Sequence, residues 1–287
     1  SISFTLPLVE FLGQGNDQLG FSLTVGMFGI CVIILLFFAF RHLREQHAEH
    51  NEAIPFKDSV RAIKNNWPWI ILVSVNLFIW ICISTRQGTV IYYCKYVLEN
   101  EGLVSILNGI QTISSLIAFI LMAFVARFVH KFGALILGAV MVAGAHYGME
   151  LSGGNSAIIF TVWAIGGFGQ GLMCGMPFGM LSDTVDYGEY VNKVRAAGFL
   201  TAIGSALCIK AGSGLGGFIP TVIMGHYGYV ANATQTADSL FGITICFVYV
   251  PIILCVIIAL PMFLYARYEA QEKQIVAELQ ARAAAAQ

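Results

Sequence analysis

Charged residues are scarce in this chain. Asp, Glu, Lys and Arg make up 11% of its 287 residues, whereas 57% are hydrophobic. A soluble domain carries about 25% charged residues, so this chain has too few to solvate a globular surface. The net charge of −1 also argues against a nucleic-acid partner, because phosphate binding needs an excess of Lys and Arg. The composition therefore predicts an α-helical membrane protein in contact with lipid.

Motifs for metal, disulfide and phosphate chemistry are missing as well. The seven cysteines stand singly in apolar surroundings without a CxxC pair, although metal sites and disulfide frameworks need close or paired spacing. There is no GxxxxGK[ST] loop, which a pump driven by ATP would carry. The middles of the apolar segments hold no nucleophile–base pair. We expect no metal within this chain, no cofactor and no enzymatic activity.

Long apolar stretches dominate what is present. A bilayer core about 30 Å thick needs roughly 20 apolar residues in a helix. The chain begins at Ser1, and residues 1–13 resemble the last part of a membrane helix, so we expect it to be cut from a longer chain. With that partial segment the sequence predicts eight spans, seven of them complete: 20–40, 67–94, 103–126, 133–151, 155–181, 196–224 and 240–266.

The connections between these stretches alternate in positive charge. Because cytoplasmic loops carry an excess of Lys and Arg, this alternation predicts that residues 41–66 and the C-terminus are cytoplasmic. The opposite connections hold only Lys95. Within 41–66, Phe56, Val60 and Ile63 recur at helical spacing, which fits either a surface-bound amphipathic helix or a solvated linker helix. Twelve basic residues lie on the first side: Arg41, Arg44, Lys57, Arg61, Lys64, Arg127, Lys131, Lys193, Arg195, Arg267, Lys273 and Arg282.

Lys210 lies close to the centre of the 196–224 span. An ammonium at that depth costs about 3 kcal/mol or more, so it should face a wet cavity or pair with a carboxylate. No acidic residue occupies the middle of a span in this sequence. Gly212, Ser213, Gly216 and Gly217 follow it as small-xxx-small pairs, which predict close helix packing. A purely structural polar contact of Lys210 is the alternative.

Other polar residues enter the spans at helical spacing. The 155–181 span has glycines every fourth residue from Gly167 to Gly179, which predicts either static packing or a helix that slides against its neighbour. Gln170 lies beside that stripe. Gln111 belongs to a polar face, with Asn108, Thr112 and Ser115, that either lines a pathway or makes inter-helix hydrogen bonds.

The 67–94 span carries Asn76 deep inside it and Arg86 about two turns from its outer end, with Tyr92 and Tyr93 nearer that end. Hydrogen-bonding groups and aromatic faces together suit a sugar, so we predict that these residues line a substrate cavity. An aromatic belt at the membrane interface would also explain the tyrosines, but it does not explain Arg86.

The segment SDTVDYGEYVNKVRAAG, residues 182–198, follows the apolar part of its helix. Its acidic residues Asp183, Asp186 and Glu189 are expected after the helix end, where the dipole disfavours them, with Lys193 and Arg195 close enough to neutralise them. We interpret the cluster either as a cytoplasmic gate of ion pairs that breaks in one state, or as a solvated turn.

At these residues the sequence resembles a known family. DTVDYGEY, Arg195 and then Lys210 with AGSGLGG are similar to the pattern of the glycoside–pentoside–hexuronide:cation symporters, the melibiose-permease-like branch of the major facilitator superfamily. RQGTVIYYCKYVL at 86–98 and HYGYVANATQTADSLFGI at 226–243 resemble the same family, and the similarity covers essentially the whole chain.

The resemblance implies a major-facilitator-type bundle of twelve helices in two halves. Residues 1–40 would end the first bundle, 41–66 would be the central cytoplasmic loop, 67–266 the complete second six-helix bundle, and 267–287 a cytoplasmic tail. The family's embedded lysine carries over to Lys210, next to the cation site and the substrate cavity. The missing N-terminal helix bundle would supply the carboxylates that bind the cation.

Two further site assignments follow from the same resemblance. The acidic run carries over to Asp183, Asp186, Tyr187 and Glu189 as part of the cytoplasmic closure, with Arg195. A tryptophan of the tenth helix contacts the sugar in the melibiose-transporting branch, and Cys174 stands at that place.

The resemblance and the polar residues together predict a sugar–cation symporter in a bacterial inner membrane, working by alternating access. The coupling cation, Na⁺, H⁺ or Li⁺, and the sugar stay open. The alternative is a membrane sensor or a channel on the same fold.

Overall fold

A computed structural model describes residues 8–9, 11–14, 16–42 and 56–285. The chain divides into two compact units, residues 1–54 and 55–287, which are described separately. Parts of two predicted segments, 1–7 with residue 10 and 43–55, lie outside the described residues. In the first unit, the main element is α2 (Asp17–His42), where the Asn16 side chain accepts a hydrogen bond from the Leu19 amide at 3.2 Å and caps the helix start.

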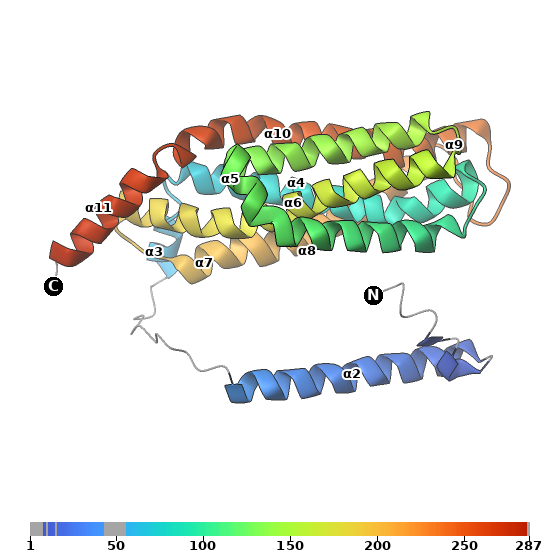
Figure 1. Cartoon of the computed structure of the whole chain (residues 1–287), viewed down its shortest axis with the longest axis horizontal. Coiled ribbons are helices and arrows are strands. Elements are labelled where there is room, and N and C mark those ends of the chain that lie inside the picture. Colours follow the sequence, from blue (N-terminus) through green and yellow to red (C-terminus); the bar gives the residue numbers. More distant parts are fainter. Residues whose placement is uncertain (1–7, 10, 15, 43–55, 286–287) are drawn as a thin grey trace. The chain divides into compact units, whose positions relative to one another are not determined.

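The second unit is a bundle of long helices that run side by side (Figure 1). Among the described residues of both units, six helices are long and apolar enough to cross a membrane, α2 of the first unit and five in the second. The predicted helix-bundle class is therefore confirmed, and the predicted number of spans stays a prediction. The elements of this unit are α3 (Phe56–Arg61), α4 (Trp67–Tyr92), η1 (Tyr93–Val97), α5 (Leu103–Leu151), α6 (Ser156–Asn192), α7 (Ala197–Ala202), η2 (Ile203–Leu207), α8 (Cys208–His226), α9 (Ala237–Thr244), η3 (Ile245–Tyr249), α10 (Val250–Glu269) and α11 (Glu272–Ala285).

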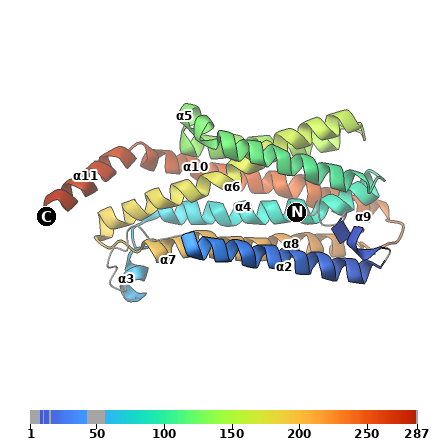
Figure 2. The ribbon, with the colours of Figure 1, turned by 60° about the horizontal axis from the view of Figure 1, so that its bottom comes forward.

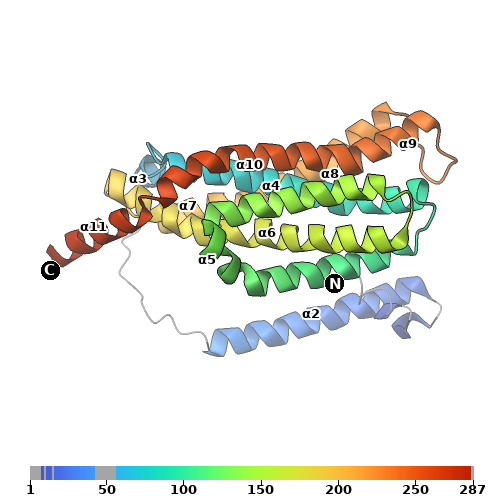
Figure 3. The same ribbon diagram turned by 45° about the horizontal axis from the view of Figure 1, so that its top comes forward.

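Helix α5 contains two stretches that the sequence predicts as separate spans, 103–126 and 133–151. It runs for 49 residues, with a sharp corner at His130, whose backbone is non-helical at φ 63° and ψ 169°. The carboxylate of Glu269 accepts hydrogen bonds from the amides of Lys131 (2.8 Å) and Phe132 (3.1 Å). These amides begin the second arm of α5 and would otherwise lack partners, so the end of α10 holds the corner (Figure 3).

The first arm of α5 packs closely against α6. A Cβ atom added at Gly167 would lie 2.9 Å from Cβ of Ser114, and one at Gly171 would lie 2.5 Å from Cβ of Ala118. One at Gly175 would lie 2.5 Å from the Met122 sulfur, whereas Gly179 has open space. The predicted close packing along this stripe is confirmed for the first three glycines.

Helix α4 packs on α6, α8 and α10 (Figure 2). It begins at Asn66, whose side chain accepts from the Trp69 amide at 3.2 Å and donates to the Thr184 carbonyl at 2.9 Å. This one residue therefore caps α4 and ties it to α6. The predicted surface helix around Phe56 is short, and Val60 on it is exposed.

The predicted end of the 155–181 helix is wrong. Helix α6 continues to Asn192 and ends at Lys193, which adopts a left-handed conformation (φ 56°). Asp183, Asp186 and Glu189 therefore lie inside the helix rather than after it. Basic partners from α5 and from the connection after α6, described below, stabilise these carboxylates and allow the helix to continue past its apolar part.

We predict that Gly171→Ala destabilises the second unit, because the added methyl would collide with Ala118 and the backbone of Ser115. Overpacking of this kind costs about 1–3 kcal/mol. The measurement is the melting temperature of the purified protein in detergent.

Gly179→Ala is the matched control, since its new methyl meets no atom within 4 Å. Alanine is a better helix former than glycine by about 1 kcal/mol, so this variant should melt at the same temperature or higher. Equal melting temperatures for the two variants would contradict the close packing at Gly171.

Candidate functional site

Arg86 is buried in the second unit, with 2% of its surface exposed. Its Nε donates to Nε2 of His146 at 2.6 Å, and its Nη2 donates to Oε1 of Gln111 at 3.2 Å. Its Nη1 donates to Oε1 of Gln170, and its guanidinium carbon lies 4.8 Å from the centre of the Trp163 ring. Side chains of α5 and α6 thus surround a cation that α4 carries.

All of these contacts of Arg86 are with neutral groups. Because His146 accepts through Nε2, its ring is neutral and its proton is on Nδ1. The face of the Trp163 ring attracts the guanidinium through its quadrupole. The cluster therefore holds a positive charge at depth with neutral acceptors and an aromatic ring. Such a charge is costly inside a membrane unless it is solvated by its neighbours.

The two glutamines of the predicted cavity, Gln111 and Gln170, are brought together by Arg86. Both turn their carbonyl oxygens towards the guanidinium, and both are half-buried. Nε2 of Gln111 is buried and has no hydrogen-bond partner among the described residues. Thr112 and Ser115, predicted to share a polar face with Gln111, bond to the backbone of their own helix.

Lys210 and Asn76 have different environments. Lys210 is exposed on α8, and among the described residues it has no hydrogen bond or ion pair. Asn76 is 3% exposed, and its amide donates to the carbonyl oxygen of Gly204 at 2.6 Å. That these two residues share one cavity with Arg86 stays a prediction.

The remaining cavity residues lie at helix contacts. The Tyr93 ring is buried and stacks on Phe247 with centroids 4.2 Å apart. The half-buried Tyr92 meets the Tyr229 ring edge-on at 5.4 Å. Cys174 is half-buried beside the hydrophobic core. A substrate contact of these three residues also stays a prediction.

The predicted gate residues gather at the end of the bundle near α11. Asp183 pairs with Lys131 at 2.7 Å, and the same ammonium pairs with Glu272 of α11 at 2.8 Å. Lys131 is the first residue after the corner of α5. Asp183 therefore has a partner, Lys131 of α5, that the sequence did not predict.

The second half of this cluster is formed by Arg195. Its guanidinium pairs with Glu189 at 2.6 Å and with Asp186 at 3.3 Å. These are the partners predicted from the sequence. Arg195 is more than half exposed, so each pair contributes little to stability by itself.

Tyr187 contributes an aromatic contact at the same end. Its hydroxyl accepts a hydrogen bond from the Trp67 indole at 2.9 Å. Its ring meets that of Tyr268 edge-on at 5.5 Å, and the Tyr268 hydroxyl donates to the Asp183 carbonyl. The start of α4, the end of α6 and the end of α10 therefore meet around Tyr187.

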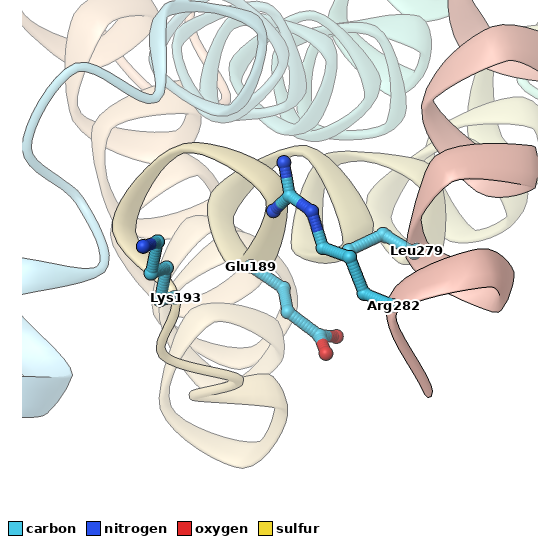
Figure 4. Close-up of a pocket in the computed structure, with 4 residues that line it drawn as sticks. All are labelled: Glu189, Lys193, Leu279 and Arg282. Carbon is cyan, nitrogen blue, oxygen red and sulfur yellow. The ribbon is translucent and has the colours of Figure 1, made fainter. Parts of the chain in front are cut away.

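Helix α11 lies along the end of α6 (Figure 4). Its Arg282 stands 4.9 Å above the Tyr190 ring and donates to the Tyr190 carbonyl at 3.2 Å. A cavity of about 530 Å³ opens here, lined by Glu189, Lys193, Leu279 and Arg282. The tail is thus attached to the predicted gate.

Several of these partners could not be identified from the sequence. His146 and Trp163 around Arg86, and Lys131, Glu269 and Glu272 around Asp183, all come from helices far away in the sequence. Spacing along one helix cannot reveal a partner on another.

The helix bundle, with a buried arginine and an exposed lysine in apolar helices, has the architecture of a membrane transporter. Residues 2–267 match the family described as MFS/sugar transport protein, and the chain belongs to that family. Its members are transporters rather than enzymes. The chain is accordingly an integral multi-pass membrane protein of a bacterial inner membrane, as its apolar helices and bacterial relatives agree.

Three curated relatives illustrate the similarity. The isoprimeverose transporter of Lactiplantibacillus pentosus is 31% identical over 97% of this chain and 59% of its own length. An uncharacterized symporter of Bacillus subtilis (strain 168) is 30% identical over 98% and 62%. A glucuronide carrier protein homolog of Escherichia coli (strain K12) is 27% identical over 88% and 56%. The chain thus spans about three fifths of these relatives.

We predict that Arg86→Lys lowers the stability of the second unit by about 2 kcal/mol or more, because lysine cannot reach His146, Gln111 and Gln170 together. Hydrogen bonds to a charged group contribute about 1.5–3 kcal/mol each. The measurement is unfolding of the purified protein in detergent.

Arg127→Lys is the control for this change, since Arg127 is exposed on α5. The same chemical substitution there should leave the unfolding transition in place. If both variants unfold like the wild type, the Arg86 cluster does not stabilise the fold.

We predict that Lys131→Met loosens α11, because Asp183 and Glu272 would then face each other without their shared cation. Backbone amides of residues 272–285 should exchange their hydrogens several-fold faster, an opening of about 1 kcal/mol for a partly exposed network. Lys273→Met, on the exposed side of the same helix, should not change the exchange. Equal exchange in both variants would show that Lys131 does not hold the tail.

Proposed function

We propose that the chain is the larger, C-terminal part of a sugar–cation symporter that works by alternating access. Membership in the MFS/sugar transport protein family supports this proposal. The printed names of the relatives include a transporter of isoprimeverose and a carrier of glucuronide. Since the chain spans only part of their lengths, the activity belongs to the full-length protein.

One observation carries the proposal, namely the environment of Lys210. Its ammonium lies on an apolar helix, is exposed in the second unit, and has no carboxylate partner among the described residues. A lysine at such depth needs water, substrate or an acidic group. In the full-length protein we expect a carboxylate of the first bundle to face Lys210, so that the lysine responds to the bound cation.

The two polar clusters of the second unit have different parts in this mechanism. The amides of Gln111 and Gln170, held by Arg86, provide hydrogen-bonding groups for sugar oxygens at mid-membrane depth. The ion pairs of Asp183, Asp186 and Glu189 close the predicted cytoplasmic end. In alternating access these pairs would break when the cavity opens to that side.

We predict that Lys210→Ala in the full-length protein abolishes cation-coupled accumulation of sugar, because the mutant loses the charge that senses the cation. Sugar counterflow, which requires no cation gradient, should persist at a reduced rate. The measurement is uptake and counterflow of labelled sugar in proteoliposomes with an imposed Na⁺ or H⁺ gradient.

The control is Lys273→Ala, which removes an exposed ammonium of α11 and should accumulate sugar as the wild type does. Normal accumulation by Lys210→Ala would refute the role of this lysine. Absence of counterflow in the wild type with every sugar tried would refute the transporter itself.

A further inference from the structure

The span that carries Lys210 is buried along one stripe only. From α7 through η2 to α8, its buried residues occur at every fourth position: Leu200, Gly204, Cys208, Gly212, Gly216, Pro220 and Met224. Lys210 is two residues from both Cys208 and Gly212. At 100° per residue it therefore lies about 200° around the helix from the buried stripe, and its side chain is exposed.

Helix α4 holds this stripe through side chains that donate to backbone carbonyls. Asn76 donates to Gly204 at 2.6 Å. Ser84 donates to Ser213 at 3.0 Å, and Thr85 donates to Gly216 at 3.1 Å. The glycines let the backbones approach, since a Cβ at Gly212 would lie 2.6 Å from Cβ of Trp80. We call these three donors with their carbonyls the α4–α8 clamp.

One contact of the clamp differs from the other two. Gly204 lies in η2, a π-helical segment of five residues, whereas Ser213 and Gly216 lie in the regular helix α8. A π turn contains one more residue than an α turn. Inside a membrane, neighbouring groups of the protein satisfy the carbonyls of such segments. In η2 the Asn76 amide donates to the carbonyl of Gly204, and the Cys208 thiol donates to that of Ile203 at 3.3 Å.

The π segment ends three residues before Lys210. An extra residue in a helix turns every following side chain by about 100° relative to an uninterrupted α-helix. In a regular α-helix, a stripe of every fourth residue rotates around the helix axis by about 40° at each step. The π segment offsets part of this rotation. The direction of Lys210 and the burial of Cys208 therefore both depend on this segment.

We propose that Asn76 is a positioning residue, which stabilises the π segment η2 and thereby sets the face of the helix on which Lys210 lies. The inference rests on the proposed role of Lys210 in transport. On this proposal Asn76 affects transport by positioning Lys210 instead of contacting the sugar directly.

The chain carries its own reporter of this register. Cys208 is 3% exposed, directly follows η2 and lies on the buried stripe, so a turn of α8 would bring its thiol to the surface. In the full-length protein, Asn76→Leu keeps the number and branching of the side-chain heavy atoms and removes the donor. We expect N-ethylmaleimide to label Cys208 about tenfold faster in this variant, with the labelled peptide identified by mass spectrometry.

Two controls accompany the measurement. Ser84→Ala removes another donor of the same clamp, from a carbonyl outside the π segment, and should change the Cys208 rate by less than about twofold. Cys255, 2% exposed on α10, should stay unlabelled in both variants. Should Asn76→Leu not be produced in folded form, Asn76→Ala carries the same test with a smaller side chain.

Cation-coupled sugar accumulation is measured on the same variants. The proposal requires that Asn76→Leu loses accumulation and Ser84→Ala keeps it. It is overturned if Cys208 labels at the wild-type rate in Asn76→Leu, if Ser84→Ala raises that rate equally, or if Cys255 becomes reactive as well. It is also overturned if Cys208 becomes reactive while accumulation stays at the wild-type level. A wild type that accumulates no sugar would defeat the symport proposal, and the Cys208 comparison would still test the register.

Discussion

The second unit depends on the hydrogen bonds that helix α4 makes within an environment that lacks water. In the hydrocarbon core every polar group must find its partner inside the protein. On one side, Arg86 of α4 binds acceptors of α5 and α6. On another side, Asn76, Ser84 and Thr85 bind carbonyls of η2 and α8. These contacts tie α4 to its neighbours, and that of Asn76 is the one that reaches the π segment preceding Lys210.

The approximate positions of the apolar helices along the chain could be predicted from the length of the apolar segments, because the thickness of the bilayer decides how many residues each span needs. The corner of α5 could not be located in this way, since it depends on the positive φ of one residue, His130, and on a carboxylate from the distant end of α10. The end of α6 is likewise not predictable from composition. Apolar composition stops at Leu181, but the helix continues because Lys131 and Arg195 neutralise its acidic residues.

Within the candidate site, the sequence identified the polar residues and not their partners. Arg86, Gln111 and Gln170 stand out because polar groups are rare in apolar helices, and the structure brings them into one cluster. Their completion by His146 and Trp163 depends on helix packing, which a single sequence does not reveal. Asn76 is the clearest example of a polar residue whose partner the sequence does not reveal. Its depth in the span follows from the sequence, but its partner is a backbone carbonyl of a π segment, and no residue type predicts where such a segment forms.

The glycine stripe of α6 also constrains how the bundle can move. The side chains of Ser114, Ala118 and Met122 each fill the space beside a glycine of α6 where a Cβ atom would otherwise lie. The two helices therefore interlock along this contact. If α6 slid a short distance along α5, each of these three side chains would collide with a residue of α6 that has a side chain. The next glycine of the stripe is four residues away, about 6 Å along the helix axis. The first arm of α5 must therefore move together with α6, or the two must shift relative to each other by the full distance between two glycines.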